Sequence, residues 1–288
     1  MAPGTPRPQS KALPWPPCPG EVTLGTAEVH VVCASVDLSA QRLRELEETL
    51  SPDELDRAAR FRFSRDVDRF IARRGLLREL LGHQLQMAPR CLVLSAGPFG
   101  KPALVTPGQE RPLHFSLAHS HDFAVFAVSR ESEVGVDMEL VRELPDVSGL
   151  VSMVCSSREM VEWRSLPESL RLQVFFELWT RKEAFLKGTG QGLQTPLREV
   201  EVPLSPGDPD RRLPVFDGGR RVPDWSLRSF STGSWALALA LRCLPTRVCC
   251  WGWPAERQWH RLPQGEAENR QCTPSAVLAR AATGTPRR

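Results

Sequence analysis

Three carboxylates and a lysine near the middle of the 288-residue chain have the types and spacing to act on a phosphate. Asp137 and Glu139 are two residues apart in a short apolar run, so in a strand both side chains point to the same face. Glu183 and Lys187 are four residues apart, which stacks them on one flank of a helix. Mg²⁺ prefers oxygen ligands and completes its shell with water and substrate phosphate. The three carboxylates could therefore hold Mg²⁺, with Lys187 facing the same phosphate.

Two elements must position these groups. The alternation in residues 134–140 predicts a half-buried strand whose other face carries Val136, Met138 and Leu140. The spacing before Gly188 predicts a helix with a buried arc made of Leu172, Phe175, Leu178, Trp179 and Leu186. Lys182 interrupts that arc, so we expect its ammonium to reach out to solvent. We expect Gly188 to end the helix in a left-handed conformation.

The same spacing also has a plainer interpretation. Asp137 and Glu139 could be a solvated strand edge, and Glu183 and Lys187 a surface ion pair, because such pairs are common on exposed helices. Spacing alone favours this interpretation.

The wording of the two runs favours the site instead. The run G-V-D-x-E is followed, after 39 intervening residues, by W-T-x-K-E-A-F-x-K. This compound pattern resembles the signature of the 4′-phosphopantetheinyl transferases, most closely the larger, surfactin-synthetase-activating (Sfp) type. The resemblance implies that Asp137, Glu139 and Glu183 hold Mg²⁺ on the pyrophosphate of coenzyme A, and that Lys187 acts in the transfer step.

Two further stretches match the family in wording. G-K-P-x-L contains Lys101, which the resemblance implies reaches a coenzyme A phosphate. F-x-x-x-H-S contains His119, implied to contact the coenzyme near its 3′-phosphate. Three neighbours depart from the family run: Ala118 replaces a serine, Ser116 an asparagine and His121 a glycine. These departures put the fine contacts around His119 in question.

The resemblance suggests further roles outside fixed motifs. Arg57 and Arg60, in a basic helical region, are candidates for the coenzyme A phosphates. Glu159 stands near the place of a family glutamate assigned to deprotonating the incoming hydroxyl, although a capping or surface role is the plainer interpretation. Three candidates for the base stay open: Glu183, Glu159 or a metal-bound water.

Composition indicates a globular protein with ample core material, at 41% hydrophobic and 25% charged residues. A net charge of +3 is too small to indicate nucleic acid as the main partner. The eight cysteines form no C-x-x-C pair, which predicts scattered thiols in a reducing cytosol. We find no run long enough for a membrane helix and no apolar signal core, so we expect a cytoplasmic protein.

The resemblance implies an α+β fold of two pseudo-duplicated halves, each a small sheet packed on a long helix. We expect the halves at residues 21–130 and 131–244, with the ligand in the cleft between them. Because one chain carries both halves, we expect a monomer. Seven prolines in residues 1–20 predict a flexible lead, and residues 245–288 form a tail of unknown role.

Local patterns predict the remaining elements. Ser51, Pro52 and Glu54 form a helix start of the capping-box type, and Gly218-Gly219 is typical of a hairpin turn. We expect strands at 29–36, 199–204, 225–230 and 235–241, and helices at 51–85, with a break near Ser64, and at 156–164.

The implied reaction transfers 4′-phosphopantetheine from coenzyme A to a serine of an apo acyl or peptidyl carrier protein and releases 3′,5′-ADP. The alternative is a catalytically impaired coenzyme A- or nucleotide-binding interaction protein on the same scaffold. An unrelated α+β domain would have to carry four family elements in the right order by chance.

Overall fold

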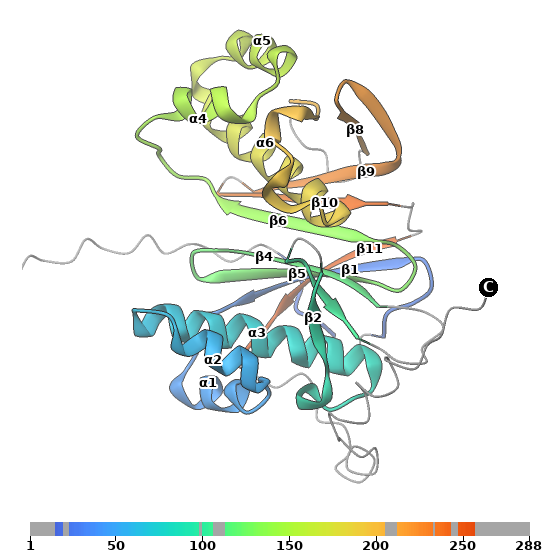
Figure 1. Cartoon of the computed structure of the whole chain (residues 1–288). Helices are drawn as coiled ribbons and strands as arrows, with labels where there is room; N and C mark the ends of the chain where they lie inside the picture. Colours follow the sequence, from blue (N-terminus) through green and yellow to red (C-terminus); the bar gives the residue numbers. More distant parts are fainter. Residues whose placement is uncertain are drawn as a thin grey trace, which may run out of the picture.

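Two large β-sheets, each covered by a long helix, and a small two-stranded sheet form the framework of the part of the chain that the computed structural model describes (Figure 1). The described residues are 15–19, 23–97, 100–105, 113–204, 212–232, 234–242 and 247–256. The α+β fold class and the pairing of each sheet with one long helix are confirmed.

The first sheet has the strand order β11-β1-β5-β4 and packs on the helix α3. Its strands are β1 (Glu28–Ser35), β4 (His114–Ser120), β5 (Phe123–Ser129) and β11 (Arg247–Trp253). Around it lie α1 (Ala40–Glu47), α2 (Pro52–Ala59), α3 (Ser64–Leu85), the 3₁₀ turn η1 (Pro89–Cys91) and the hairpin strands β2 (Leu94–Ala96) and β3 (Pro102–Leu104). The leucine-rich face of α3 fills the core beneath this sheet.

The second sheet has the strand order β6-β10-β9-β8-β7 and packs on α6. Its strands are β6 (Val134–Leu140), β7 (Val200–Glu201), β8 (Leu213–Asp217), β9 (Arg220–Thr232) and β10 (Trp235–Leu241). The helices are α4 (Val147–Val154), α5 (Ser157–Ser165) and α6 (Glu168–Thr189), with the 3₁₀ turns η2 (Gly192–Gln194) and η3 (Leu197–Glu199).

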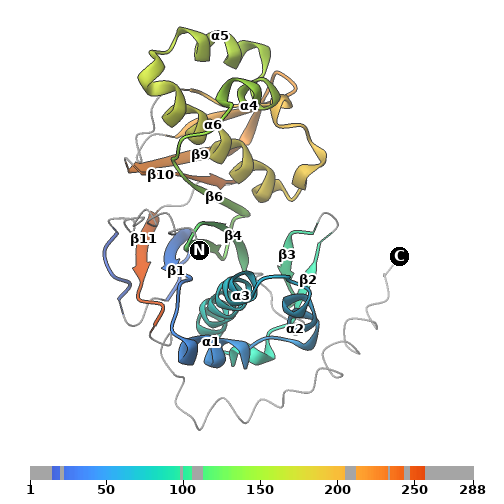
Figure 2. The same cartoon turned by 90° about the vertical axis from the view of Figure 1, so that its left-hand side faces the viewer.

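The inner faces of the two sheets pack against each other (Figures 1 and 2). Val31 and Val125 from the first sheet share a core with Val136, Met138 and Leu237 from the second. The layers therefore run from α3 through both sheets to α6. This stacking places the edge strand β4 beside the edge strand β6, which is where the two halves meet.

Most expected elements are present. The break near Ser64 separates α2 from α3, and the Ser51–Glu54 capping box opens α2. Gly218 and Gly219 connect β8 to β9 with φ angles of 54° and 76°, as a hairpin turn that needs left-handed residues requires. The sequence patterns missed α1, α4 and β8. The proline in β8 and the glycine and β-branched residues in α4 obscured those patterns.

The expected boundaries at both ends need correction. Within the supposed tail, β11 pairs in parallel with β1, so the chain returns to the first sheet after completing the second. Part of the supposed flexible lead is also ordered against β11, where Cys18 N donates to Gly252 O at 2.8 Å. Residues 1–14 and 257–288 lie outside the described residues.

The described residues bear on two expectations, that the cysteines are free thiols and that no helix spans a membrane. Free thiols are found at Cys18, Cys33, Cys155, Cys249 and Cys250, whereas Cys91 is disulfide-bonded. Among the helices of the ranges given above, none has the length and apolar character needed to span a bilayer.

Candidate functional site

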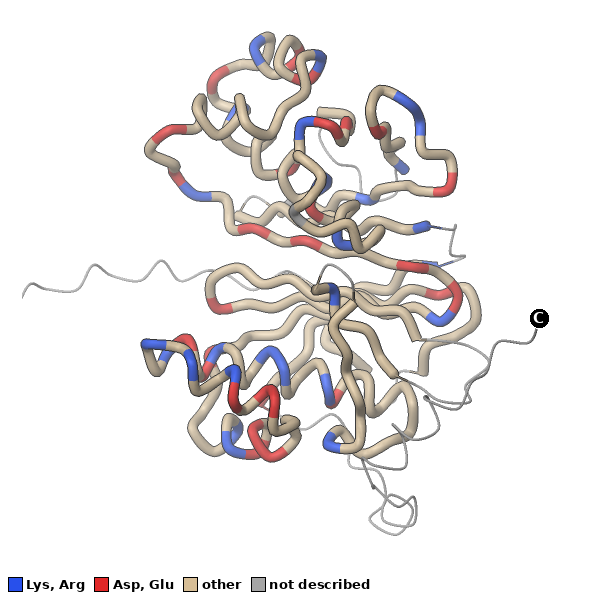
Figure 3. The backbone as a smooth tube through the Cα atoms, in the orientation of Figure 1, with Lys and Arg blue, Asp and Glu red and all other residues tan. Residues whose placement is uncertain are grey.

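A cleft of about 840 Å³ opens between the two halves, with α2, α3 and β4 on one side and β6 and the end of α6 on the other. Its lining is rich in cations: Arg57, Arg69, Arg73, Arg74, Lys101, Arg142 and Lys187. Among the residues that the structure describes, its acidic lining consists of Asp66 and Glu139. Basic residues lie along α3, and acidic residues lie on β6 (Figure 3). The cleft therefore suits a ligand that carries several negative charges.

The arginines of α3 differ in how far they are already neutralised. Arg69 forms an ion pair with Asp122, and Arg74 Nε lies 3.3 Å from Glu54 Oε1. Arg73 makes no ion pair or hydrogen bond with any described residue. Partial burial, together with the charge of Arg69, lowers its pKa to about 10. A bound anion would offset both the burial and the repulsion from Arg69, so Arg73 is well placed to contact an anion.

The two arginines expected to bind coenzyme A are placed differently. Arg57 lines the cleft, with its guanidinium 5.6 Å from the centre of the Phe70 ring. Arg60 is exposed at the C-terminal end of α2 and does not line the cleft. The prediction for Arg60 is therefore not supported by the geometry.

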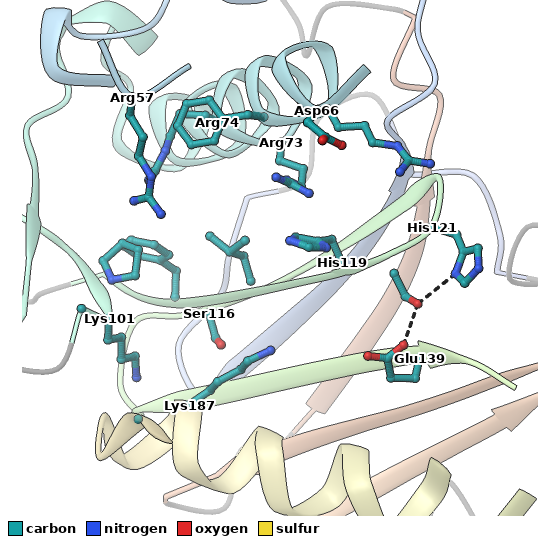
Figure 4. A pocket seen from close by; sticks show the side chains of 18 of the residues that line it. Arg57, Asp66, Arg73, Arg74, Lys101, Ser116, His119, His121, Glu139 and Lys187 are labelled. Carbon is teal, nitrogen blue, oxygen red and sulfur yellow. Dashed lines mark hydrogen bonds between the residues drawn. The ribbon is translucent and has the colours of Figure 1, made fainter. Parts of the chain in front are cut away.

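His119 projects from β4 into the cleft, where it lies opposite Arg73 (Figure 4). Enclosure by the cleft walls and, to a smaller extent, the charges of Arg73 and Lys187 together lower its pKa to about 4. The imidazole is therefore neutral at neutral pH.

The departures around His119 have plain structural explanations. Ala118 is 3% exposed in the core between the sheets, so its missing hydroxyl removes nothing from the cleft wall. His121 has a φ of 54°, the conformation that glycine adopts without strain. Ser116 Oγ accepts a hydrogen bond from Val136 N at 3.1 Å and so joins β4 to β6.

Lys101 crosses from the first half to the second. It follows Gly100, whose φ of 81° shapes the turn between β2 and β3. Lys101 Nζ donates to Gly188 O at 2.8 Å and to Val134 O at 3.3 Å. Burial lowers the pKa of its ammonium. The lysine expected to contact phosphate thus lines the cleft at the C-terminal end of α6.

Asp137 lies deeper than the expected half-buried strand would place it. It is 5% exposed because α6 covers this face of β6 while the other face packs between the sheets. Asp137 Oδ1 accepts from Lys187 Nζ at 2.6 Å, whereas the buried Oδ2 has no partner among the described residues. Burial raises the pKa of this carboxyl, and Lys187 partly offsets that effect.

Two glycines allow α6 to approach β6 this closely. A Cβ on Gly135 would collide with Ala184 O and with the backbone of Gly188. A Cβ on Gly188 would meet the Trp225 ring at 2.5 Å. Gly188, which was expected to end the helix, lies inside α6, and Gly190, with a φ of 74°, ends it. The close contact brings the last turns of α6 onto Asp137.

Glu139 and Glu183 complete the expected acidic group. Glu139 lines the cleft, and Glu183 lies on α6. Burial raises the pKa of Glu183, and the charges of Asp137 and Glu139 raise it further. No three carboxylates, histidines or cysteines converge tightly enough, in the described ranges, to hold a metal as they stand. The set nevertheless fits Mg²⁺, because its donors are all carboxylate oxygens and the buried Asp137 Oδ2 lacks a partner.

Glu159 is not brought into the cleft. It is 2% exposed, and its Oε2 lies 2.5 Å from Lys182 Nζ and accepts from Ser156 N. Its Oε1 accepts from Val202 N at 2.8 Å. Lys182 is fully buried rather than reaching solvent, since its ammonium also donates to two backbone carbonyls. Glu159 therefore acts as a structural partner that ties α5 to α6, and we no longer assign it a catalytic role.

Sequence reasoning did not select Arg73, Arg142 or Ser120 as functional residues. A signal for Arg73 was present, because Arg69 and Arg73 are four apart and so share the helix face opposite the leucine stripe. Ser120 ends the F-x-x-x-H-S run, but its contact with Glu139, like the position of Arg142, depends on the packing of β4 beside β6 and is not visible in the sequence.

Models of known protein families match both halves of the chain. Residues 133–240 match the family model described as the 4′-phosphopantetheinyl transferase superfamily, and residues 38–131 match the model described as 4′-phosphopantetheinyl transferase, N-terminal. The 4′-phosphopantetheinyl transferase HetI of Nostoc sp. is 38% identical over 74% of this chain and 86% of that protein.

Two further relatives are similar over shorter stretches. A putative 4′-phosphopantetheinyl transferase of Synechocystis sp. is 37% identical over 66% of this chain and 71% of its own. The human L-aminoadipate-semialdehyde dehydrogenase-phosphopantetheinyl transferase is 26% identical over 62% of each chain. With both halves matched and most of HetI covered, the chain belongs to the 4′-phosphopantetheinyl transferase superfamily.

Proposed function

We propose that the protein is an Sfp-type enzyme that transfers 4′-phosphopantetheine from coenzyme A to a serine hydroxyl of an apo carrier protein and releases 3′,5′-ADP. The observation that carries this proposal is the cleft between the halves, where seven cationic side chains lie in one lining with Glu139 and one of them, Lys187, pairs with the buried Asp137. Coenzyme A carries a pyrophosphate and a 3′-phosphate, which match that charge pattern. A volume of about 840 Å³ lies in the range of small-molecule sites.

We propose that the two ends of the cleft bind different phosphate groups of coenzyme A. Arg73 and His119 face each other on the side of α3, where they would bind one phosphate. Lys101 and Lys187 lie near the end of α6, where they would face the pyrophosphate. Because residues of one chain form both walls, we propose that the enzyme acts as a monomer.

The acidic group would hold Mg²⁺ through Asp137, Glu139 and Glu183. When bound there, Mg²⁺ supplies charge neutralisation for the pyrophosphate. Lys187 stabilises the negative charge that develops on the departing phosphate. Glu183 makes no hydrogen bond with a described residue, so we propose that one of its oxygens would bind the cation and the other would accept the serine proton.

Intact-mass spectrometry of the carrier tests this function. The protein is incubated with coenzyme A, Mg²⁺ and an apo carrier protein from a fatty acid, polyketide or nonribosomal peptide system. The proposal predicts that a carrier gains the mass of one phosphopantetheinyl group, that 3′,5′-ADP appears in equal amount, and that chelation of Mg²⁺ stops both. Tight binding of coenzyme A without any mass gain on all three carriers would instead support the impaired binding protein.

A further inference from the structure

Ser120 connects the two halves at the acidic group. It is the last residue of β4 and is 6% exposed. Its hydroxyl accepts from Leu140 N of β6 at 3.2 Å and lies 2.7 Å from Glu139 Oε2 (Figure 4). His121 Nδ1 lies 3.3 Å from the Ser120 hydroxyl oxygen. Since a hydroxyl has one proton to give, the carboxylate receives it, and Leu140 N donates to a lone pair of the hydroxyl oxygen.

This hydrogen bond fixes the orientation of Glu139. The other contact to that carboxylate is Arg142 Nη1 at 3.8 Å, from a side chain that is 48% exposed. An exposed charge at that distance holds a carboxylate weakly. Both contacts fall on Oε2, which leaves Oε1 without a protein partner among the described residues. Ser120 is therefore the firm contact that keeps one oxygen in place and the other available.

We infer that Ser120 is a positioning residue that orients Glu139 as a ligand for Mg²⁺, an inference that rests on the proposed function. The first half of the protein thereby sets the geometry of a ligand that belongs to the second half. Outer partners of metal ligands typically contribute about 10–100-fold to metal affinity.

Ser116 provides a matched control on the same strand. Its hydroxyl also lies on β4, is 5% exposed, and accepts from a backbone N–H of β6, that of Val136, at 3.1 Å. It has no contact with a carboxylate in the described structure. Ser116→Ala and Ser120→Ala thus each remove one hydroxyl bridge between the halves, and only the second frees Glu139.

The test measures Mg²⁺ binding directly, by isothermal titration calorimetry of the full chain saturated with coenzyme A and without carrier protein. We expect Ser120→Ala to weaken Mg²⁺ affinity by about tenfold and Ser116→Ala to change it by less than about twofold. Thermal unfolding should show that both variants remain folded, with the larger shift in Ser120→Ala, which also loses the hydrogen bond to Glu139. In a Glu139→Gln background, Ser120→Ala should have no further effect, because its partner is already altered.

Several outcomes would overturn the inference. Equal Mg²⁺ affinity in Ser120→Ala and wild type, an equal loss in Ser116→Ala, or an additive loss in the Glu139→Gln background would each remove the role of Ser120 while leaving an active wild-type enzyme. If the wild type bound no Mg²⁺ in the presence of coenzyme A and modified no carrier, the proposed function would fail as well.

Discussion

Lys187 Nζ lies 2.6 Å from Asp137 Oδ1, so an ammonium from α6 neutralises the buried carboxylate at the centre of the acidic group. The pair links the two roles proposed for the site, metal binding and phosphate contact, because a cation bound by Asp137 would require Lys187 to release that carboxylate. The contact depends on the close packing of Gly135 against Gly188.

Lys187→Met should therefore destabilise the metal-free protein. It leaves Asp137 buried without a counter-charge, at a cost of about 1–3 kcal/mol, which is below that of a fully buried pair because Lys187 is 34% exposed. Mg²⁺ with coenzyme A should restore much of the loss, since the cation binds the freed carboxylate. Thermal unfolding with and without these ligands measures both effects. Arg158→Met, which removes an exposed ion pair with Glu162, is the control and should change little.

The same lysine should affect turnover more than binding. We expect Lys187→Ala to lower kcat by about a hundredfold to a thousandfold with little change in KM for coenzyme A, because its contact strengthens in the transition state. Lys187→Arg should recover part of the rate. A normal kcat with a raised KM would make Lys187 an ordinary phosphate-binding residue.

Arg73→Ala should raise KM for coenzyme A by about 10–100-fold, the loss expected for a charge-assisted hydrogen bond, while kcat changes little. Arg60→Ala is the matched control, since Arg60 lies outside the cleft and should leave KM within about twofold. Arg73 and His119 face each other, so with dephospho-coenzyme A the effects of their substitutions should shrink together if they share the 3′-phosphate. Unequal behaviour would separate their ligands.

His119 should titrate near pH 4 in the ligand-free protein, well below the ordinary value for histidine. Its pKa is lower in the folded than in the unfolded state, so the unfolded chain binds the proton first and stability falls as pH drops from about 6.5 towards 4. His119→Gln should remove that part of the acid sensitivity. NMR titration of the ring gives the pKa directly, and bound coenzyme A should raise it. A pKa near 6.5 in the free protein would contradict the account.

The sequence predicted which residues lie at the cleft better than how they pack. Asp137, Glu139 and Glu183 were selected by the resemblance of their two motifs to the transferase signature, because periodicity places them on a strand face and a helix flank but alone favours a surface role. The close approach of α6 to β6 depends on contact between Gly135 and Gly188, which are 53 positions apart in the chain, and no local pattern reveals it. The return of β11 to the first sheet was missed for the same reason, since its partner β1 lies at the other end of the chain.

Buried charge was the other source of error. Lys182 breaks the apolar arc of α6, and sequence reasoning placed its ammonium in solvent because burying an unpaired charge is costly. The structure resolves that cost with Glu159, which lies on a different helix and whose pairing depends on tertiary contact.

Glu159→Gln distinguishes that structural role from catalysis. It leaves the Lys182 ammonium buried without a counter-charge, which typically costs about 3–5 kcal/mol. Urea unfolding should therefore show a large loss of stability, whereas kcat per folded molecule should stay near that of the wild type. A stable variant with a strongly reduced kcat would return Glu159 to the list of candidate bases.

A crystal structure of the protein with coenzyme A and Mg²⁺ tests the central claim most directly. The account predicts that the coenzyme lies in the cleft between the halves, with one phosphate between Arg73 and His119 and the pyrophosphate beside Lys101. It also predicts that Mg²⁺ is bound by Asp137, Glu139 and Glu183, and that Lys187 has left Asp137 for a phosphate oxygen. Coenzyme A bound elsewhere, or Mg²⁺ bound while the 2.6 Å contact between Lys187 and Asp137 persists, would contradict it.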